Sequence, residues 1–440
     1  MLYITPVGES GFHKEIANIA PDKSISHRAV IFSLLSSTPS IIHNYLLAED
    51  TLNTLSIAKH LGLQVQELTK DSASFSLIPP KNIQEPNCVL DCGNAGTAMR
   101  LFIGLLAGIE GYFVLSGDQY LCARPMCRVA NPLKEIGATI YMRKGGFAPV
   151  SILGRKLNGF DFTSPIASAQ VKSAMILAAL NAKESSIYRE STLTRDHTER
   201  MLQGMGAPLR IEDSSTHRLI HIEPIISPLK GIEITIPADP SSAFFFALAA
   251  AITPKSSVVL KNVLLNKTRI EAFKILQSMG TIIEYRTTHS LYEDVGDIYV
   301  EYAPLKAVHI HSNIAWLIDE LPALGIAMVY AQGTSEVSNA KELRVKESDR
   351  ITTLLTNLKA LGITCEEKED GYKIYGGIES IKLDSIPVLQ SFGDHRIAMS
   401  FAIMGLRERI CIDDTNCIAT SFPNFVEILR TITTVQTRPQ

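Results

Sequence analysis

Helix candidates with an apolar body and a polar or charged start recur along this chain. The starts lie at intervals of about 70 to 80 residues, at Asp22, Asn94, Ser168, Asp239, Asp319 and Gly393. The apolar bodies are clearest at residues 101–106, 174–180, 244–252 and 397–406. A repeat of this length predicts an architecture built from similar units. It also draws attention to the helix starts, because their unpaired N–H groups and positive dipole end attract anions.

A second marker has the same period. Helix candidates of mixed polarity each end in an apolar residue followed by glycine, and a strand candidate comes next. These glycines are Gly62, Gly137, Gly206, Gly280 and Gly362. Glycine at this position is the usual left-handed helix stop. A sixth copy of the marker is predicted to begin at residues 422–425 and to reach the C-terminus. Together the markers predict an α/β fold of six units, each with two short helices and several strands.

Length and composition are those of a globular enzyme with two domains. A chain of 440 residues exceeds what one core usually supports, so we expect two domains of three units each. The boundary is predicted near residue 237, where the chain reads Ile236-Pro237-Ala238-Asp239-Pro240. A formal net charge of −3 argues against a nucleic-acid partner, which requires a basic surface. Local basic clusters can still bind a small anion.

The sequence predicts neither a membrane partner nor export nor a metal. It contains no apolar run of the roughly 18 to 20 residues that a membrane span needs, and residues 1–8 lack the layout of a signal peptide. Seven cysteines without a CxxC pattern favour reduced thiols and a cytoplasmic location. The cysteine spacings match no zinc pattern and there is no HExxH motif, so no metal is expected.

The first polar start is the richest in anion-binding side chains. Lys23, Ser24 and Arg28 lie just before the apolar residues 29–35. Lysine offers a compact charge and arginine a planar fork, and both suit phosphate or carboxylate. The simpler interpretation is a capped helix start with solvated charges. So many donors within so short a segment favour an anion site.

Other clusters are weaker when taken one at a time. The turn at residues 91–97 has two glycines before a helix, so its backbone N–H groups can approach a ligand, but it is neither a Walker A loop nor a GxGxxG motif. Lys346 and Arg350 are four residues apart and are predicted to share one helical face, with Glu347 beside them. A salt-bridged surface helix is the alternative for that segment.

The last two starts combine charge with helix polarity. His395 and Arg396 are predicted to lie at the positive end of an apolar helix, where cations are disfavoured unless an anion is nearby. Asp319 is predicted to be an N-cap residue, with proline in the following turn. If it faces Lys23 and Lys346, Asp319 is a candidate base.

Taken in order, these motifs resemble those of the 5-enolpyruvylshikimate-3-phosphate synthase family. Seven collinear motifs carry the resemblance over nearly the whole chain, at residues 21–28, 93–97, 124–126, 168–170, 194–197, 346–350 and 393–396. The resemblance implies an inside-out α/β barrel with two domains, each of three βαβαββ units. It places residues 1–21 and 237–440 in one domain and residues 22–236 in the other, with the active site in the cleft between them.

The resemblance also implies an activity. Such enzymes transfer the enolpyruvyl group of phosphoenolpyruvate to the 5-hydroxyl of shikimate 3-phosphate, by addition and elimination, in aromatic amino acid biosynthesis. Shikimate 3-phosphate binds first, phosphoenolpyruvate second, and the domains close over both. Two anionic substrates side by side require several cations in a water-poor site. No cofactor is implied, and we expect a cytoplasmic monomer whose partners are these small molecules.

The resemblance assigns roles to individual positions. The implied shikimate 3-phosphate contacts are Lys23, Ser24, Arg28, Ser168, Ala169, Gln170, Arg195, Asp319 and Lys346. The implied phosphoenolpyruvate contacts are Lys23, Asn94, Gly96, Thr97, Arg124, Gln170, Arg350 and Arg396. The catalytic set is Lys23, Asp319, Glu347 and His395. Within that set Asp319 is the candidate for taking the hydroxyl proton, Glu347 for handling the C3 proton and Lys23 for serving the departing phosphate.

Several positions depart from the enterobacterial pattern and resemble the second class of the family, some members of which tolerate glyphosate. Glu342 replaces an asparagine, His197 a tyrosine and Ala169 a serine, and residues 418–423 lack an expected lysine. That class often has alanine where this chain has Gly96. Because a methyl group there would crowd the phosphoenolpyruvate pocket, Gly96 favours a pocket that glyphosate can still enter.

Two other functions are compatible with the repeats. The sister enzymes that transfer enolpyruvyl to UDP-N-acetylglucosamine usually have a reactive cysteine five residues before an Arg-Pro pair, where this chain has Gln119. They also lack the Ser-x-Ser-His-Arg run found here at residues 24–28. A non-catalytic anion-binding relative would keep the fold, but the intact Lys23, Asp319 and Arg396 argue against lost activity.

Overall fold

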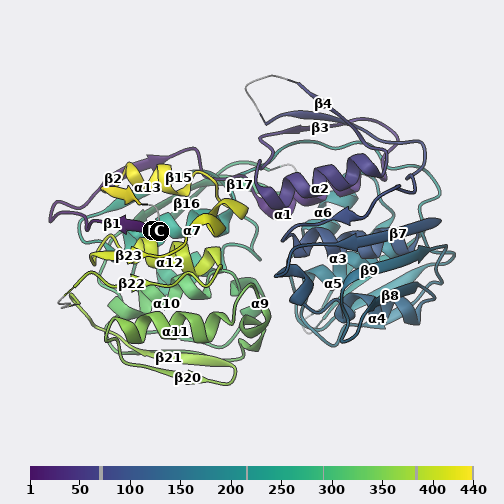
Figure 1. Ribbon diagram of the computed structural model, residues 1–440. Helices are drawn as coiled ribbons and strands as arrows, with labels where there is room; N and C mark the ends of the chain where they lie inside the picture. The colour runs from purple at the N-terminus through teal and green to yellow at the C-terminus, as the bar shows by residue number, and fades with distance from the viewer. Residues whose placement is uncertain (69–72, 215–216, 291, 382–384, 439–440) are drawn as a thin grey trace. The chain divides into compact units, whose positions relative to one another are not determined.

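The computed structural model describes residues 1–68, 73–214, 217–290, 292–381 and 385–438. The chain divides into two compact units, one of residues 21–236 and one formed by residues 1–20 together with residues 237–440 (Figure 1). The chain therefore passes from one unit to the other twice, at residues 20–21 and 236–237.

The unit of residues 21–236 contains three sheets and three buried helices. The buried helices are α1 (Lys23–Ser33), α3 (Gly96–Ala107) and α5 (Ala169–Ala179). Three further helices and a 3-10 turn are α2 (Glu49–His60), α4 (Cys127–Glu135), α6 (His197–Gly204) and η1 (Leu121–Ala123). The first sheet orders β14 (Glu233–Thr235), β3 (Ser40–His43), β5 (Phe75–Ile78) and β4 (Gln64–Glu67). The second orders β6 (Leu90–Asp91), β7 (Gly111–Ser116), β9 (Phe147–Gly154) and β8 (Thr139–Arg143), and the third β10 (Asp161–Thr163), β11 (Ser186–Glu190), β13 (Arg218–Ile222) and β12 (Leu209–Asp213).

The other unit has the same content. Its buried helices are α7 (Pro240–Ile252), α10 (Leu321–Tyr330) and α12 (His395–Met404). The remaining helical segments are α8 (Glu271–Ser278), α9 (Ile314–Leu317), η2 (Lys341–Val345), α11 (Arg350–Ala360), η3 (Asn416–Thr420) and α13 (Phe425–Arg430). Two sheets order β16 (Ile282–Ser290), β17 (Asp294–Glu301), β15 (Ser257–Leu264) and β2 (His13–Ile16), and β18 (His309–Ile310), β19 (Thr334–Val337), β21 (Gly371–Tyr375) and β20 (Cys365–Lys368). The last orders β22 (Val388–Leu389), β23 (Ile410–Ile412), β1 (Leu2–Ile4) and β24 (Val435–Thr437).

All six sheets share one pairing pattern. In each, an edge strand pairs in parallel with its neighbour, and the remaining two strands pair antiparallel. Strands from far along the chain complete three of these sheets: β14 pairs with β3 in one unit, and in the other β2 pairs with β15 and β1 lies between β23 and β24. The sixth copy of the repeat includes α13 and β24, as predicted, but the first strand of the chain completes its sheet. Spacing alone gave no sign of that pairing.

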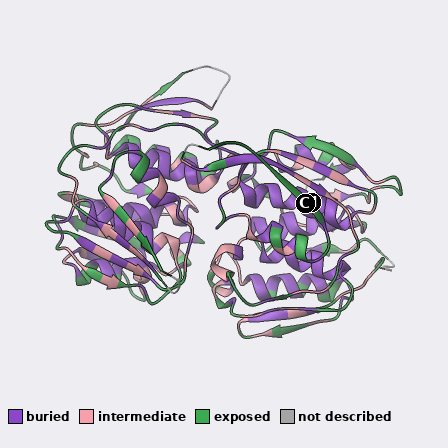
Figure 2. Ribbon diagram, turned by 180° about the vertical axis from the view of Figure 1, so that it is seen from behind, coloured by how far each residue is buried: buried purple, intermediate pink, exposed green. Residues whose placement is uncertain are grey.

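The buried helices form the core of each unit. The helices α7, α10 and α12 contact one another, and α3 contacts both α1 and α5. Every residue of α7 is buried, which is typical of a helix surrounded by protein on all sides. Figure 2 shows the buried helices, while strands at the outside of each unit carry exposed residues. Within the described part of the chain, the helices are too short or too polar to span a bilayer.

The glycine stops predicted from the sequence are confirmed. Gly62, Gly137, Gly206, Gly280 and Gly362 all have positive φ, between 75° and 122°. Each directly follows the C-cap residue of a helix, namely α2, α4, α6, α8 or α11. A glycine adopts this left-handed conformation without steric cost, so the chain can turn from each helix into the next strand.

Candidate active site

The polar starts predicted from the sequence lie at or next to the first residues of the six buried helices. A side chain caps four of these helices, with Asp22, Ser168, Asp239 and Asp394 accepting hydrogen bonds from backbone N–H groups of the first turn. The starts of α3 and α10 have no side-chain cap bond. Uncapped N–H groups at a helix start are available to a ligand.

The start of α1 combines two cations in different environments. Lys23 is partly exposed, and its Nζ lies 2.5 Å from Asp50 Oδ2. Arg28 is buried and donates from three nitrogens, to Thr198 Oγ1 at 2.8 Å, to Ser24 O at 2.9 Å and to Ser173 Oγ at 3.0 Å. None of these three acceptors carries a charge. These hydrogen bonds hold the Arg28 guanidinium in place at the start of α1.

His27 adds no charge to this cluster. Its ring is buried, and Nδ1 lies 2.7 Å from Thr54 Oγ1. Burial, together with the charges of Lys23 and Arg28, lowers the pKa of His27 well below the ordinary histidine value. The neutral form therefore dominates at physiological pH, and the positive charge at the start of α1 resides on Lys23 and Arg28.

The starts of α3 and α5 are joined through Gln170. Its side-chain amide donates to Thr97 Oγ1 at 3.0 Å and accepts a hydrogen bond from Arg100 Nη1. Because Thr97 and Arg100 lie on α3 and Gln170 on α5, two motifs about 70 residues apart in sequence meet here. The structure thus brings together Thr97 and Gln170, which the sequence placed in the same site.

Arg124 joins the same cluster from the loop before α4. It donates to Asn94 Oδ1, and Asn94 in turn donates from Nδ2 to Asp118 Oδ2 at 2.8 Å. A Cβ atom added at Gly96 would lie 3.2 Å from Arg124 Nη1 and 3.4 Å from Arg100 Nη1. The uncapped first turn of α3 therefore opens towards two guanidiniums, an arrangement suited to a phosphate or carboxylate.

The remaining predicted residues of this unit lie at the start of α5 and just before α6. Ser168 caps α5, accepting from the N–H of Val171 at 3.4 Å, and Ala169 is the first helical residue. The carbonyl of Ala169 accepts a hydrogen bond from the Ser173 hydroxyl at 2.7 Å. Arg195 is partly buried in the segment between β11 and α6.

In the other unit, one arginine forms ion pairs with three carboxylates. Arg350 is 1% exposed, and its Nε lies 2.9 Å from Asp394 Oδ2. Its Nη1 lies 3.2 Å from Asp319 Oδ1, and its Nη2 lies 2.5 Å from Glu347 Oε2. The two candidate proton-handling residues, Asp319 and Glu347, are thus fixed by the same cation.

Two predictions about this region were wrong. Lys346 and Arg350 do not share a helical face, because the 3-10 segment η2 ends at Val345 and α11 begins only at Arg350. The signal was present in Asp349, whose carboxylate caps α11. Asp319 is not an N-cap either: Glu320 holds that position in α10. Asp319 lies one residue earlier, where its carboxylate can reach Arg350 instead.

Arg396 is the least satisfied cation that the structure describes in this region. Its side chain is 7% exposed, yet Nε and Nη1 are buried without a hydrogen-bond partner among the described residues. The guanidinium carbon lies 5.9 Å from the centre of the Phe245 ring, and the neighbouring His395 is also buried. Leaving a charged donor unpaired is costly, so Arg396 indicates an anion site at the start of α12.

Lys346 lies beside the Arg350 cluster. Burial, reinforced by the charge of Arg350, lowers the pKa of its ammonium group from the ordinary lysine value, although the charge of Asp319 opposes the change. Lys346 therefore holds its proton less tightly than an exposed lysine does.

Sequence reasoning missed the partners that hold these residues. Asp50 pairs with Lys23, Arg100 with Gln170, and Asp394 with Arg350. Two of them lay within recognised motifs: Arg100 is one turn after Gly96 on α3, and Asp394 precedes His395. Asp50 stands alone at the start of α2, and no motif marks it.

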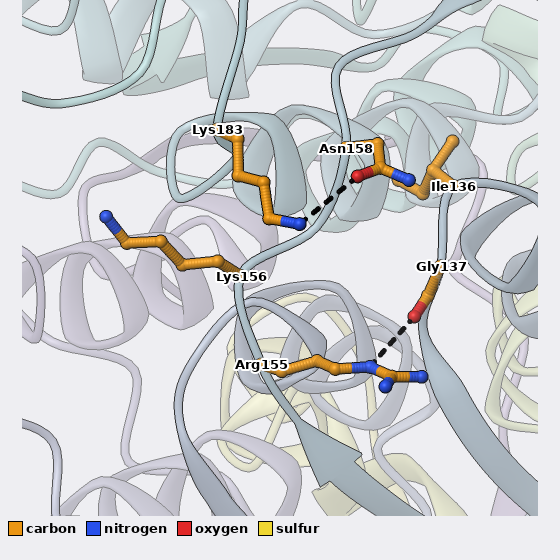
Figure 3. Close-up of a pocket in the computed structure, with 6 residues that line it drawn as sticks. All are labelled: Ile136, Gly137, Arg155, Lys156, Asn158 and Lys183. Carbon is orange, nitrogen blue, oxygen red and sulfur yellow. Dashed lines mark hydrogen bonds between the residues drawn. The ribbon is translucent and has the colours of Figure 1, made fainter.

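A separate pocket of about 210 Å³ lies outside these clusters (Figure 3). Ile136, Gly137, Arg155, Lys156, Asn158 and Lys183 line it. Arg155 is used internally, donating from Nε to the carbonyl of Gly137 at 3.2 Å. None of the predicted site residues lines this pocket.

Comparison with known proteins identifies the class first. The enolpyruvyl transferase NikO from Streptomyces tendae has a solved structure that covers 100% of this chain and 99% of its own, with a TM-score of 0.78 and 15% identity. A solved structure of EPSP synthase from Acinetobacter baumannii has a TM-score of 0.84 and 36% identity, and covers 99% of both chains. The fold is therefore that of the enolpyruvyl transferases, as predicted.

The family follows from sequence. The family model described as EPSP synthase (3-phosphoshikimate 1-carboxyvinyltransferase) matches residues 8–429. The 3-phosphoshikimate 1-carboxyvinyltransferase of Wolinella succinogenes is 57% identical over 434 residues, which are 98% of this chain and 97% of the relative. This chain belongs to the EPSP synthase family, and the resemblance inferred from the seven motifs is confirmed.

Proposed function

We propose that this chain transfers the enolpyruvyl group of phosphoenolpyruvate to the 5-hydroxyl of shikimate 3-phosphate and releases phosphate. Family membership over residues 8–429 supports this reaction. The observation that carries the proposal is the pair of guanidiniums, Arg100 and Arg124, beside the uncapped first turn of α3 at Gly96. An anion is the ligand that a helix start beside two guanidiniums stabilises.

Shikimate 3-phosphate is proposed to bind at the starts of α1 and α5. Arg28 and Lys23 supply charge, Ser24 and Ser168 supply hydroxyl groups, and Gln170 supplies an amide. Ala169 contributes backbone at the start of α5 and Arg195 a further guanidinium. Asp319 and Lys346, from the other unit, are proposed to hold the shikimate hydroxyls.

Phosphoenolpyruvate is proposed to bind the guanidinium groups of Arg124, Arg350 and Arg396. Asn94 orients Arg124, and Thr97 orients Gln170, through the hydrogen bonds described above. We expect Arg396 to be a stronger anion ligand than Arg350, because Arg350 already pairs with three carboxylates. The role of Arg350 is then partly to hold Asp319 and Glu347 near the substrates.

The reaction proceeds by addition and then elimination. In the addition, the 5-hydroxyl oxygen bonds to C2 of phosphoenolpyruvate, its proton passes to Asp319, and the electron pair of the C2–C3 double bond takes a proton at C3 from the protonated carboxyl group of Glu347. The proton held by Asp319 is released together with the phosphate after the elimination. In the elimination, Glu347 removes a proton from C3, the double bond re-forms and the C2–O bond to phosphate breaks. Lys23 stabilises the departing phosphate as its negative charge develops. His395 is proposed to assist beside Arg396.

The activity is tested by measuring phosphate release from phosphoenolpyruvate. We expect release with shikimate 3-phosphate as acceptor and none with UDP-N-acetylglucosamine. Release only with the sugar nucleotide would reassign the chain to the sister activity. No release with either acceptor, from protein shown to be folded, would indicate a non-catalytic anion-binding protein.

The assigned catalytic residues are tested by Asp319→Ala and Lys23→Ala. Each variant is expected to lose at least about 100-fold in kcat, because general-base catalysis or charge stabilisation by one group is worth that much or more. Both side chains are partly exposed, so the fold should survive. Circular dichroism checks this, and unfolding of either variant would show that a structural residue had been taken for a catalytic one.

A further inference from the structure

A buried lysine ties the start of α5 to the segment that carries Arg195. Lys172, on the first turn of α5, is completely buried. Its Nζ lies 3.0 Å from Glu190 Oε2 and 2.8 Å from Glu199 Oε1. Both carboxylates are buried as well. One ammonium group therefore bridges two acidic residues that are nine positions apart in the sequence.

The two acids mark the ends of one loop. Glu190 is the last residue of β11, and Glu199 lies in the first turn of α6. The other oxygen of Glu190 accepts hydrogen bonds from the backbone N–H of Thr194, at 2.9 Å, and from its hydroxyl. The residue before Arg195 is thus fixed by the same acid that Lys172 holds.

A second link, next to the first, reaches the start of α1. Ser173 follows Lys172 on α5, and its Oγ lies 2.6 Å from Thr198 Oγ1 on α6. The same two hydroxyl groups accept from Nη2 and Nε of Arg28. The start of α5, the Arg195 loop and Arg28 therefore form one connected framework.

Burial and the neighbouring carboxylates act on the pKa of Lys172 in opposite directions. Burial alone would lower the pKa of Lys172, but the charges of Glu199 and Glu190 outweigh it and raise the pKa above the ordinary lysine value. Arg218 approaches the same group, with Nη1 3.9 Å from Glu199 Oε1 and 3.6 Å from Asp196 Oδ2. Buried ion pairs seldom add net stability over an apolar core, whereas removing one partner is costly. A role in positioning gives a reason for so many charges in a buried place.

We propose that Lys172 is a positioning residue for the shikimate 3-phosphate site: by holding Glu190 and Glu199, it sets Arg195 in place relative to Ser168, Ala169 and Gln170. This inference rests on the proposed function. Lys172 is fully buried, so it acts through the loop and does not touch substrate. The part of shikimate 3-phosphate that Lys172 affects is the part that these residues contact.

The test separates substrate affinity from turnover. Lys172→Met removes the charge at nearly constant length, and a displacement of a binding group by about 1 Å can cost up to about 100-fold. We expect the KM for shikimate 3-phosphate to rise at least about 10-fold, whereas the KM for phosphoenolpyruvate and kcat change less than about 3-fold. Direct titration of shikimate 3-phosphate, without phosphoenolpyruvate, should show the same loss of affinity.

A matched control removes a buried cation elsewhere. Arg269 is 2% exposed and lies 2.8 Å from Asp239 in the other unit. Arg269→Met should destabilise the protein to a similar degree while leaving the KM for shikimate 3-phosphate within about 3-fold. A triple variant, Lys172→Met with Glu190→Gln and Glu199→Gln, removes the unpaired carboxylates and should recover stability but not affinity, because the ionic bridge stays absent.

The outcomes are distinct. An unchanged KM for shikimate 3-phosphate in a folded Lys172→Met protein would overturn the proposal. So would equal changes in kcat and both KM values, or a KM that recovers with stability in the triple variant. If neither Lys172→Met nor the triple variant folds, Lys172 is required for folding, and the proposal is overturned as well. A wild-type protein that shows no shikimate 3-phosphate-dependent phosphate release contradicts the proposed function itself, a result visible before any variant is made.

Discussion

The starts of α7 and α12 lie in the same unit and are capped in the same way, yet they differ in charge balance. Asp239 and Asp394 each accept a hydrogen bond at 2.8 Å from the N–H two residues on. Asp239 then pairs with Arg269, which also donates to Ser241. Asp394 pairs with Arg350, which it shares with two further carboxylates. The start of α12 also carries Arg396, with buried nitrogens that no described residue pairs.

This difference shows how a repeated scaffold can supply one helix start whose charges are paired within the protein and one that is suited to binding a ligand. At α7 the charges of Asp239 and Arg269 pair within the protein, and they serve stability. At α12 a second guanidinium, that of Arg396, is added, and none of the described residues pairs with its buried Nε and Nη1, which is why we propose an anionic ligand as its partner. The capping residue is the same in both. Whether a helix start is suited to binding an anion depends on whether its cationic side chains all have carboxylate partners within the protein.

The largest expected effect comes from Arg396→Met. Removing a donor aimed at a developing charge costs about 100- to 1,000-fold in turnover, and we expect kcat/KM for phosphoenolpyruvate to fall by at least that much. Because the wild-type guanidinium is buried with unpaired nitrogens, the free energy of unfolding should stay constant or rise. Steady-state kinetics and thermal unfolding check both parts. A clear loss of stability would show that Arg396 has a structural partner, and the comparison with α7 would fail.

A smaller effect is expected from Gly96→Ala. The added methyl would lie 3.2 Å from Arg124 Nη1, in the space proposed for phosphoenolpyruvate. We expect the KM for phosphoenolpyruvate to rise about 10-fold and inhibition by glyphosate to weaken more, because losing a well-fitting contact is worth about 1–3 kcal/mol. Alanine is favoured over glycine within helices, so stability should not fall. Inhibition and substrate titrations measure the effect, and unchanged values for both ligands would place the anion elsewhere.

The third prediction concerns pH. Because burial and Arg350 lower the pKa of Lys346, this lysine loses its charge at a lower pH than an exposed lysine. The affinity for shikimate 3-phosphate should therefore fall on the alkaline side as Lys346 becomes neutral. Lys346→Arg keeps its charge at all accessible pH values and should move this fall to higher pH. A pH profile of kcat/KM tests the prediction, and identical alkaline limbs in both proteins would contradict it.

The smallest effect on activity is expected from Arg269→Met, the counterpart of Arg396→Met. Removing one partner of a buried ion pair costs roughly 3 to 5 kcal/mol of stability. Because α7 has no proposed substrate contact, kcat and both KM values of the folded protein should change less than about 3-fold. Denaturant unfolding and kinetics on the same sample give both numbers. Loss of activity without loss of stability would mean that the start of α7 also contacts substrate.

The sequence predicted the scaffold well because the scaffold is periodic. The helix starts, the glycine stops and the six units all follow from short-range patterns that recur. The pairing of the charges could not be predicted in the same way, since Arg269 is 30 residues from Asp239 and Arg350 is 44 residues from Asp394. Which charges are neutralised internally depends on contacts between distant segments. For this reason the motifs indicated Arg350 as a ligand but not the three carboxylates that surround it in the structure.

Local errors had a local cause. The spacing of Lys346 and Arg350 is compatible with one helix. Asp349 rules this out, because it caps α11, which begins at Arg350. Lys346 therefore lies outside α11, as the C-cap residue of η2. The break also leaves Glu347 between the two helical segments, from where it reaches Arg350. A capping residue inside a charged run is therefore more informative than the spacing of the charges.

The position of β1 sets an order of assembly. This strand, at residues 2–4, lies between β23 and β24 and pairs with residues 410–412 and 435–437. During synthesis the residues 21–236 are contiguous and can complete all three of their sheets as soon as β14 has emerged. The first strand must wait, unpaired, until almost the last residue of the chain is made. Nascent chains halted before residue 410 should therefore expose β1 to proteases, while the 21–236 unit is already resistant.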